Sequence, residues 1–263
     1  IVTWPAYQSL AEVAAAIGSQ VVRWPLLLRD GAWKLDAEAL SRLITPRTRM
    51  VVVNFPHNPT GYQPSRPEWD AIIEVVRGAG AVLFSDEMYR ELEYDESARL
   101  PSACDRYERA ITLSGLSKSF GLPGLRIGWL ATQDRDLLTK AARIKDYTTI
   151  CSGAPSEILG VIALRARETI VNRNVEIVRH NLDLARDFFG ARPEAFEWLS
   201  PMAGPVAFPR LRLPVTALEY AQQCLETRGA MVAPGEMFDM PGHFRVGLGR
   251  KSLGAALRAL GEQ

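Results

Sequence analysis

Apolar runs alternate with helix-period segments over roughly the first 150 residues of the chain. Short continuous apolar runs bounded by turn residues are typical of buried strands, and apolar residues spaced by three or four positions are typical of amphipathic helices. This alternation favours βαβ units, so we expect an α/β fold in which flanking helices cover a mostly parallel sheet. The expected strands are 1–4, 21–28, 50–55, 81–85, 111–113 and 127–131, and the expected helices are 7–18, 35–44 and 65–77.

The helix expected over 65–77 has the clearest start signal. Ser65 and Glu68 have the spacing of a capping box, and Pro67 lies in the first turn, where a missing N–H group is tolerated. The expected buried face of this helix consists of Trp69, Ile72, Ile73 and Val76.

The pattern changes in the last third of the chain. A long and mainly helical stretch covers 155–192, and shorter elements follow it. We therefore expect two domains, a large one over 1–167 and a small C-terminal α+β domain over 168–263. The short elements expected in the second are extended segments at 205–213, 231–233 and 244–248, a helix at 218–228 and a final short helix.

Composition and charge exclude several kinds of partner. The formal net charge is +1, which gives no reason to expect nucleic acid or an anionic membrane surface. No apolar run reaches the length of a membrane span. Cys104, Cys151 and Cys224 show neither disulfide nor metal-ligand spacing, so we expect no metal and a reducing, cytoplasmic setting. Because the chain opens at Ile1 on a strand-like run, we also expect it to begin inside a domain.

Polar clusters follow three of the expected strands. The tetrapeptide Asn-Pro-Thr-Gly begins at Asn58 after 50–55, Asp86 and Tyr89 follow 81–85, and Lys118 lies in a loop after 111–113. Ligands of open parallel sheets bind beyond the carboxyl ends of the strands. The pattern therefore predicts that these four side chains surround one crevice.

Four motifs occur in an order that resembles a known family. They are Asn-Pro-Thr-Gly at 58–61, Asp-x-x-Tyr at 86–89, Ser-Lys at 117–118 with an arginine eight residues after the lysine, and Phe-Arg-Val-Gly at 244–247. Each is weak alone, but together they resemble the class I/II aminotransferases of pyridoxal-phosphate (PLP) fold type I, the aspartate aminotransferase superfamily. The resemblance covers essentially the whole chain.

The resemblance implies a role for each central residue. Lys118 would hold PLP covalently and move a proton between the substrate α-carbon and the cofactor. Asp86 would pair with the pyridine nitrogen and keep the ring protonated, so that the ring accepts electrons. Tyr89 and Asn58 would hydrogen-bond the phenolic oxygen of the cofactor. Arg245 would bind the substrate α-carboxylate through two hydrogen bonds, with Asn58 beside it.

The resemblance also implies a phosphate site and a stacking aromatic. Arg126 corresponds to the phosphate-binding arginine, and Ser117 or Ser119 would add a hydroxyl group. Many relatives carry a hydroxyl residue three positions before the lysine, where this chain has Gly115. Tyr7 corresponds to the aromatic residue that stacks on the cofactor ring. His57 precedes the Asn-Pro-Thr-Gly turn and is expected to support it without a catalytic role.

The function implied is PLP-dependent amino transfer between an α-amino acid and a 2-oxo acid, in an enzyme that the resemblance implies is a homodimer. Two alternatives stay open. The same residues could serve a PLP-dependent lyase, decarboxylase or cyclase. Relatives also carry, before the segment equivalent to Ile1, a phosphate-cradling helix N-terminus and an aromatic donated across the dimer interface, so this chain could be a non-catalytic fragment.

Overall fold

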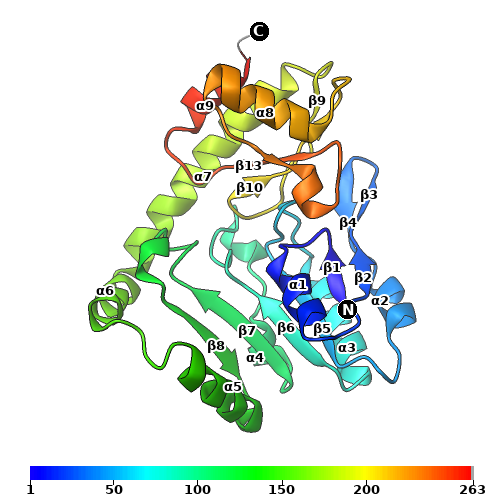
Figure 1. Cartoon of the computed structure of the whole chain (residues 1–263), viewed down its shortest axis with the longest axis vertical. Helices are drawn as coiled ribbons and strands as arrows, with labels where there is room; N and C mark the ends of the chain where they lie inside the picture. The colour runs from blue at the N-terminus through cyan, green and yellow to red at the C-terminus, as the bar shows by residue number, and fades with distance from the viewer. Residues whose placement is uncertain (262–263) are drawn as a thin grey trace.

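A six-stranded sheet forms the centre of the computed structural model, which describes residues 1–261 of the 263-residue chain (Figure 1). The strand order is β2-β1-β5-β6-β7-β8, and all neighbours are parallel except β7 and β8, which are antiparallel. The expected α/β fold with a mostly parallel sheet is therefore confirmed. The strands are β1 (Val2–Trp4), β2 (Arg23–Pro25), β5 (Met50–Asn54), β6 (Val82–Asp86), β7 (Ala110–Gly115) and β8 (Gly128–Thr132).

The register of the central strands brings their carboxyl ends to the same edge. Asn54 at the end of β5 pairs with Asp86 at the end of β6, and Asp86 pairs with Leu113 in β7. The polar segments that follow these strands consequently leave the sheet side by side.

Helix α3 (Arg66–Gly78) has the expected capping box, in which the Ser65 side chain accepts from the Glu68 backbone and the Glu68 side chain accepts from Ser65. Its apolar face is buried against the sheet in the largest hydrophobic cluster. The other helices of the first half are α1 (Ser9–Ala16), α2 (Ala37–Leu43) and α4 (Ala103–Arg106).

The long helix α7 (Arg167–Gly190) runs from beside the sheet to the C-terminal elements (Figure 1). It follows α5 (Arg135–Thr148) and α6 (Ala154–Arg165). A three-stranded antiparallel sheet, β10-β13-β12, then packs with helices α8 and α9. These later elements are β9 (Phe196–Glu197), β10 (Val206–Ala207), β11 (Arg210–Leu211), α8 (Ala217–Arg228), β12 (Ala233–Pro234), β13 (Phe244–Gly247) and α9 (Leu253–Gly261).

Two expected elements differ in the structure. The extended segment expected over 21–28 ends early, and a hairpin of β3 (Leu27–Arg29) and β4 (Ala32–Lys34) follows β2. Asp30 and Gly31 form its turn with φ values of 52° and 73°, which suit a type I′ hairpin. The helical stretch expected over 155–192 is broken at Ala166, whose ψ of 18° separates α6 from α7.

Within residues 1–261, no helix is both long enough and apolar enough to span a membrane.

Candidate functional site

The ends of β5 and β6 are joined by one buried side chain, Asn54. Its Nδ2 donates to the backbone oxygen of Asp86 at 2.9 Å, and its Oδ1 accepts from the backbone N–H of Asn58 at 2.8 Å. Asn54 therefore fixes the Asn-Pro-Thr-Gly turn relative to the strand that carries Asp86.

Asp86 is the central acid of the site and is only 7% exposed. One carboxylate oxygen accepts from the backbone N–H of Met88 at 3.0 Å. Burial raises the pKa of Asp86 to about 6, although the Met88 hydrogen bond and the nearby positive charge of Lys118 act in the opposite direction.

Lys118 is exposed and lies in the loop between β7 and β8. The base of the loop is narrow because Gly115 pairs with Gly128, and a Cβ on Gly115 would lie 2.8 Å from the Ile127 oxygen. A side chain at position 115 would therefore require the backbone of the opposite strand to shift. The next residue, Ser119, is buried and donates to the backbone oxygen of Met88 or Arg90.

Asn58 and Arg245 meet although 187 residues separate them in the sequence. Arg245 Nη1 donates to Asn58 Oδ1 at 2.8 Å, and the guanidinium lies 5.3 Å from the centre of the Phe238 ring. The contact brings β13 of the C-terminal part to the carboxyl edge of the central sheet. An arginine held by a neutral amide keeps its charge available for an anion.

Tyr89 is buried in the same group of side chains. Burial raises its pKa to about 12; the charge of Arg245 lowers the pKa, whereas Asp86 and Tyr7 raise it. Tyr7 itself is 50% exposed, so part of its ring faces outward rather than into a core.

Hydrogen bonds thus join Asn58 to Arg245, and they join the Asn58 turn through Asn54 to the strand of Asp86. The hydroxyl of Ser119, next to Lys118, donates to the backbone on either side of Tyr89. Ser117 is half-buried beside Lys118. Arg126 is exposed, has a left-handed backbone with φ 54°, and donates from Nη1 to the Pro123 oxygen. Among the contacts of residues 1–261, no hydrogen bond or ion pair joins Arg126 to Asp86 or Tyr89.

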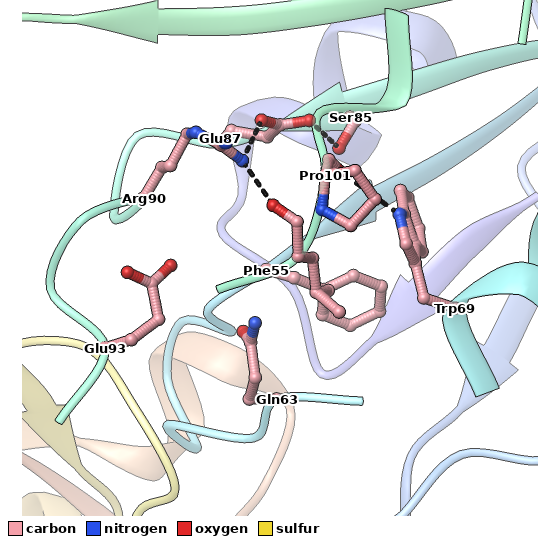
Figure 2. Close-up of a pocket in the computed structure, with 9 residues that line it drawn as sticks. Phe55, Gln63, Trp69, Ser85, Glu87, Arg90, Glu93 and Pro101 are labelled. Carbon is pink, nitrogen blue, oxygen red and sulfur yellow. Dashed lines mark hydrogen bonds and ion pairs between the residues drawn. The ribbon is translucent and has the colours of Figure 1, made fainter. Parts of the chain in front are cut away.

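Glu87, which lies between Asp86 and Tyr89 in the sequence, belongs to a buried polar network, and Figure 2 shows it beside Ser85 and Arg90. Glu87 Oε1 accepts from the Ala103 N–H at 2.9 Å and from the hydroxyls of Ser85 and Ser102, each at 3.2 Å. The pKa of Glu87 is raised above its ordinary value by burial, although these hydrogen bonds and the charge of Arg90 act in the opposite direction. The adjoining cavity has a volume of about 10 Å³, close to that of one water site and too small for an amino acid.

His57 lies next to the site as a structural residue. It is buried, and its Nδ1 is 2.8 Å from the Thr60 hydroxyl within the Asn-Pro-Thr-Gly turn. Burial lowers the pKa of His57 to about 4. The contact with Thr60 agrees with the expectation that His57 supports the Asn-Pro-Thr-Gly turn.

Sequence reasoning missed Asn54, Glu87 and the backbone contacts of Ser119. Asn54 has a visible signal, because it is a lone amide at the end of an otherwise apolar strand. Glu87 has a weaker one, an acid between two residues of the Asp-x-x-Tyr motif. The contacts of Ser119 depend on how two loops meet in space and leave no mark in the sequence.

Known proteins resemble this chain in sequence. The profile of the family described as aminotransferase class I and II matches residues 1–259. The chain is 31% identical to the capreomycidine synthase of Streptomyces vinaceus over 100% of the chain and 67% of that protein. It is 36% identical to the probable N-succinyldiaminopimelate aminotransferase DapC of Mycobacterium tuberculosis over 71% of the chain and 46% of that protein.

Solved structures resemble the chain over almost its full length. A PLP-dependent aminotransferase of Streptococcus suis matches with a TM-score of 0.91 and 30% identity, over 98% of this chain and 68% of that one. The PLP-dependent cyclase OrfR matches with a TM-score of 0.88 and 30% identity, over 99% and 70%. The fold is that of the PLP-dependent enzymes of fold type I. The chain belongs to the aminotransferase class I and II family.

The donor set fits PLP chemically. A buried carboxylate with a free oxygen suits a protonated pyridine nitrogen, and the Tyr89 hydroxyl and Asn58 amide can donate to a phenolate oxygen. Lys118 supplies a primary amine beside Asp86. These residues could hold the cofactor at the carboxyl edge of the sheet.

Proposed function

We propose that this chain is a PLP-dependent aminotransferase that moves an amino group between an α-amino acid and a 2-oxo acid. The observation that carries the proposal is the buried Asp86 carboxylate at the sheet edge where Asn58 holds Arg245. The Lys118 loop is joined to the segment after Asp86 through the Ser119 hydroxyl. One acid, one amine and one carboxylate-binding guanidinium at a single edge are the groups that this reaction requires.

Each side chain would act on a defined atom. When bound, PLP would supply an electron sink for the substrate α-carbon. Lys118 Nζ would hold the cofactor covalently and then carry the proton that leaves the α-carbon. Asp86 would keep the pyridine nitrogen protonated, and the Tyr89 hydroxyl would donate to the phenolic oxygen. The Arg245 fork would orient the substrate carboxylate.

The outer contacts complete the proposed site. Tyr7 would stack on the cofactor ring, and Arg126 with Ser117 would bind the phosphate. We prefer Ser117 to Ser119 for this role because the Ser119 hydroxyl already donates to a backbone oxygen of the turn after β6.

A PLP-dependent cyclase is the second candidate, because OrfR carries that description and matches at 30% identity. Both reactions begin by removing a proton from the substrate α-carbon, so the residues named above would serve either. Product analysis distinguishes them. Amino transfer converts a 2-oxo acid to an amino acid, whereas a cyclase yields a ring without consuming a 2-oxo acid.

We further propose domains over 1–167 and 168–263. All buried members of one hydrophobic cluster lie between Val178 and Leu260, which supports a separate C-terminal core. Leu199, Phe208 and Phe238 are exceptions, because they pack in the cluster of the first domain.

A homodimer is supported by apolar side chains exposed on α5 and α6. A reducing, cytoplasmic setting is supported by three free cysteines.

The visible absorption spectrum of the purified chain mixed with PLP tests the function. We expect a band that differs from free PLP and changes when the correct amino acid is added, as the bound cofactor takes up the amino group. Lys118→Ala should abolish both signals, whereas Lys140→Ala on the exposed face of α5 should leave them unchanged. A wild-type spectrum identical to that of free PLP would refute the proposal.

A further inference from the structure

Three polar side chains recur at seven-residue intervals along α7, at Arg167, Asn174 and Asn181. Seven residues are nearly two helical turns, so all three lie on one face of the helix. Each makes a hydrogen bond to a different segment outside the helix, and each segment adjoins a residue of the candidate site.

The first two contacts hold the segments that follow β6 and β7. Arg167 Nε donates to Glu91 Oε1 at 2.8 Å, two residues beyond Tyr89. Asn174 Nδ2 donates at 2.9 Å to the backbone oxygen of Ser119, the residue that follows Lys118. The Ser119 hydroxyl in turn donates to the turn after β6, so one residue links the lysine loop both to α7 and to the segment of Tyr89.

The third contact holds the strand that carries Arg245. Asn181 is 1% exposed, and its Nδ2 donates at 2.7 Å to the backbone oxygens of both Leu248 and Arg250. Leu248 directly follows β13, and its own N–H donates to the Pro205 oxygen at 2.7 Å. One amide group therefore fixes the end of the Arg245 strand against the helix.

We propose that Asn174 and Asn181 are positioning residues that set the separation of Lys118 from Arg245. The inference rests on the roles proposed above for Lys118 and Arg245. Seven residues of helix span about 10 Å, and a single unbroken helix holds that length rigidly. α7 thereby connects the group that carries the proton to the group that orients the carboxylate, which lie in different parts of the fold.

The two asparagines act on different steps, and this difference provides the test. Asn174→Ala frees the Lys118 loop, so it should lower kcat about tenfold and slow the absorbance change on PLP binding, with KM for the amino acid unchanged. Asn181→Ala loosens the Arg245 strand, so it should raise that KM about tenfold with kcat unchanged. Such changes correspond to the loss of about one hydrogen bond.

Matched variants separate positioning from general damage. Asn172→Ala removes an exposed asparagine from the same helix and should change neither constant. Asn181→Ser keeps one hydrogen-bond donor on a smaller side chain and should give a KM between those of wild type and Asn181→Ala. This variant keeps the test usable if Asn181→Ala folds poorly. If Asn174→Ala and Asn181→Ala both change kcat and KM by the same factors, the two residues are merely structural and the inference is wrong.

Amide hydrogen exchange in the PLP-free protein decides the inference independently of the function. Asn174→Ala should speed exchange at Gly121 and Leu122, whose N–H groups close the lysine loop, and leave Leu248 unchanged. Asn181→Ala should do the reverse. If the wild-type chain shows no reaction with PLP but the exchange rates change as expected, the proposed function fails while the positioning contacts stand. Unchanged exchange in both variants refutes the positioning contacts.

Discussion

At the scale of single residues, burial of the Asp86 carboxyl group makes the stability of the folded chain depend on pH. Its pKa is about 6 in the folded chain against an ordinary value of 3.8. Between these values the unfolded chain has lost the proton and the folded chain retains it, so stability falls as pH rises from about 4 to 6. By the usual conversion of about 1.4 kcal/mol per pKa unit, the loss amounts to about 3 kcal/mol.

We therefore expect Asp86→Asn to stabilise the PLP-free protein at pH 7 relative to wild type, by roughly 2–3 kcal/mol more than at pH 4. The asparagine can still accept the Met88 hydrogen bond while carrying no charge. Urea denaturation at both pH values measures the difference. Asp146→Asn, at an exposed position on α5, is the control and should show no such gain. A pH-independent difference for Asp86→Asn would contradict the argument.

The buried His57 makes stability change with pH in the opposite direction. Burial lowers its pKa from 6.5 to about 4, so the unfolded chain gains a proton in this range that the folded chain does not take up. Stability is therefore lost as pH falls from about 6.5 to 4, by roughly 3 kcal/mol. His57→Asn, whose amide can donate to or accept from the Thr60 hydroxyl, should remove this loss.

The effects of Asp86 and His57 offset each other in wild type, because they cover nearly the same pH range with opposite signs. The contributions of Asp86 and His57 to the pH dependence of wild-type stability should consequently nearly cancel between pH 4 and 6.5. Asp86→Asn should expose the acid destabilisation due to His57, and the double variant should remove both effects. Measuring all four proteins in one denaturation series checks this. A double variant that retains the slope of either single variant would disprove the offset.

At the scale of elements, the turn between β7 and β8 depends on a close approach of two glycines. Gly115→Ala would bring a Cβ to 2.8 Å from the Ile127 oxygen and 2.9 Å from the Gly128 Cα. We expect a loss of stability of about 1–3 kcal/mol, together with weaker PLP binding as the lysine loop shifts. Thermal denaturation and titration with PLP measure the two effects.

Gly124→Ala is the control, because it lies in the same loop and a Cβ there would meet no atom within 4 Å. It should leave stability unchanged or raise it by about 0.5 kcal/mol, through the lower entropy of the unfolded chain. If the two alanine variants behave alike, the close approach of Gly115 and Gly128 does not control the loop.

Much of this element arrangement was predictable, for identifiable reasons. Parallel strands end at one edge, so Asn58, Asp86 and Lys118 could be grouped from the apolar runs before them. The hairpin of β3 and β4 had a signal as well, the Asp-Gly pair at 30–31, but the expected extended segment ended at residue 28, before this pair.

The remaining contacts were not predictable because they join distant segments. The Asn58–Arg245 hydrogen bond spans 187 residues, and only the resemblance pointed to Arg245. Asn174 and Asn181 look like ordinary polar residues on a solvated helix. Their seven-residue spacing gains meaning only when the lysine loop and β13 are seen against the same helix face.

At the scale of the whole molecule, large apolar side chains are exposed on α5, on α6 and in the segment between these helices. Figure 1 shows where the two helices lie in the fold. Tyr147 is 94% exposed and Ile150 is 74% exposed, which is unusual for side chains of this size in a monomer. We call this group the α5–α6 surface. Its members include Ile144, Tyr147, Ile150, Ile158, Leu159, Val161 and Ile162.

If the chain forms the proposed homodimer, the α5–α6 surface is the part of the molecule that gains most from burial. Covering one isoleucine contributes about 1.5–3 kcal/mol, whereas covering an unpaired arginine is unfavourable. The double variant Ile158→Arg/Ile162→Arg should therefore weaken self-association at least about 100-fold. Light scattering coupled to size-exclusion chromatography over a range of concentrations measures this. Met231→Arg, at an 81% exposed position in the C-terminal part, should leave the mass unchanged. A dimer that survives the double variant would place the interface elsewhere, and a wild-type monomer at every concentration would rule out self-association through this surface.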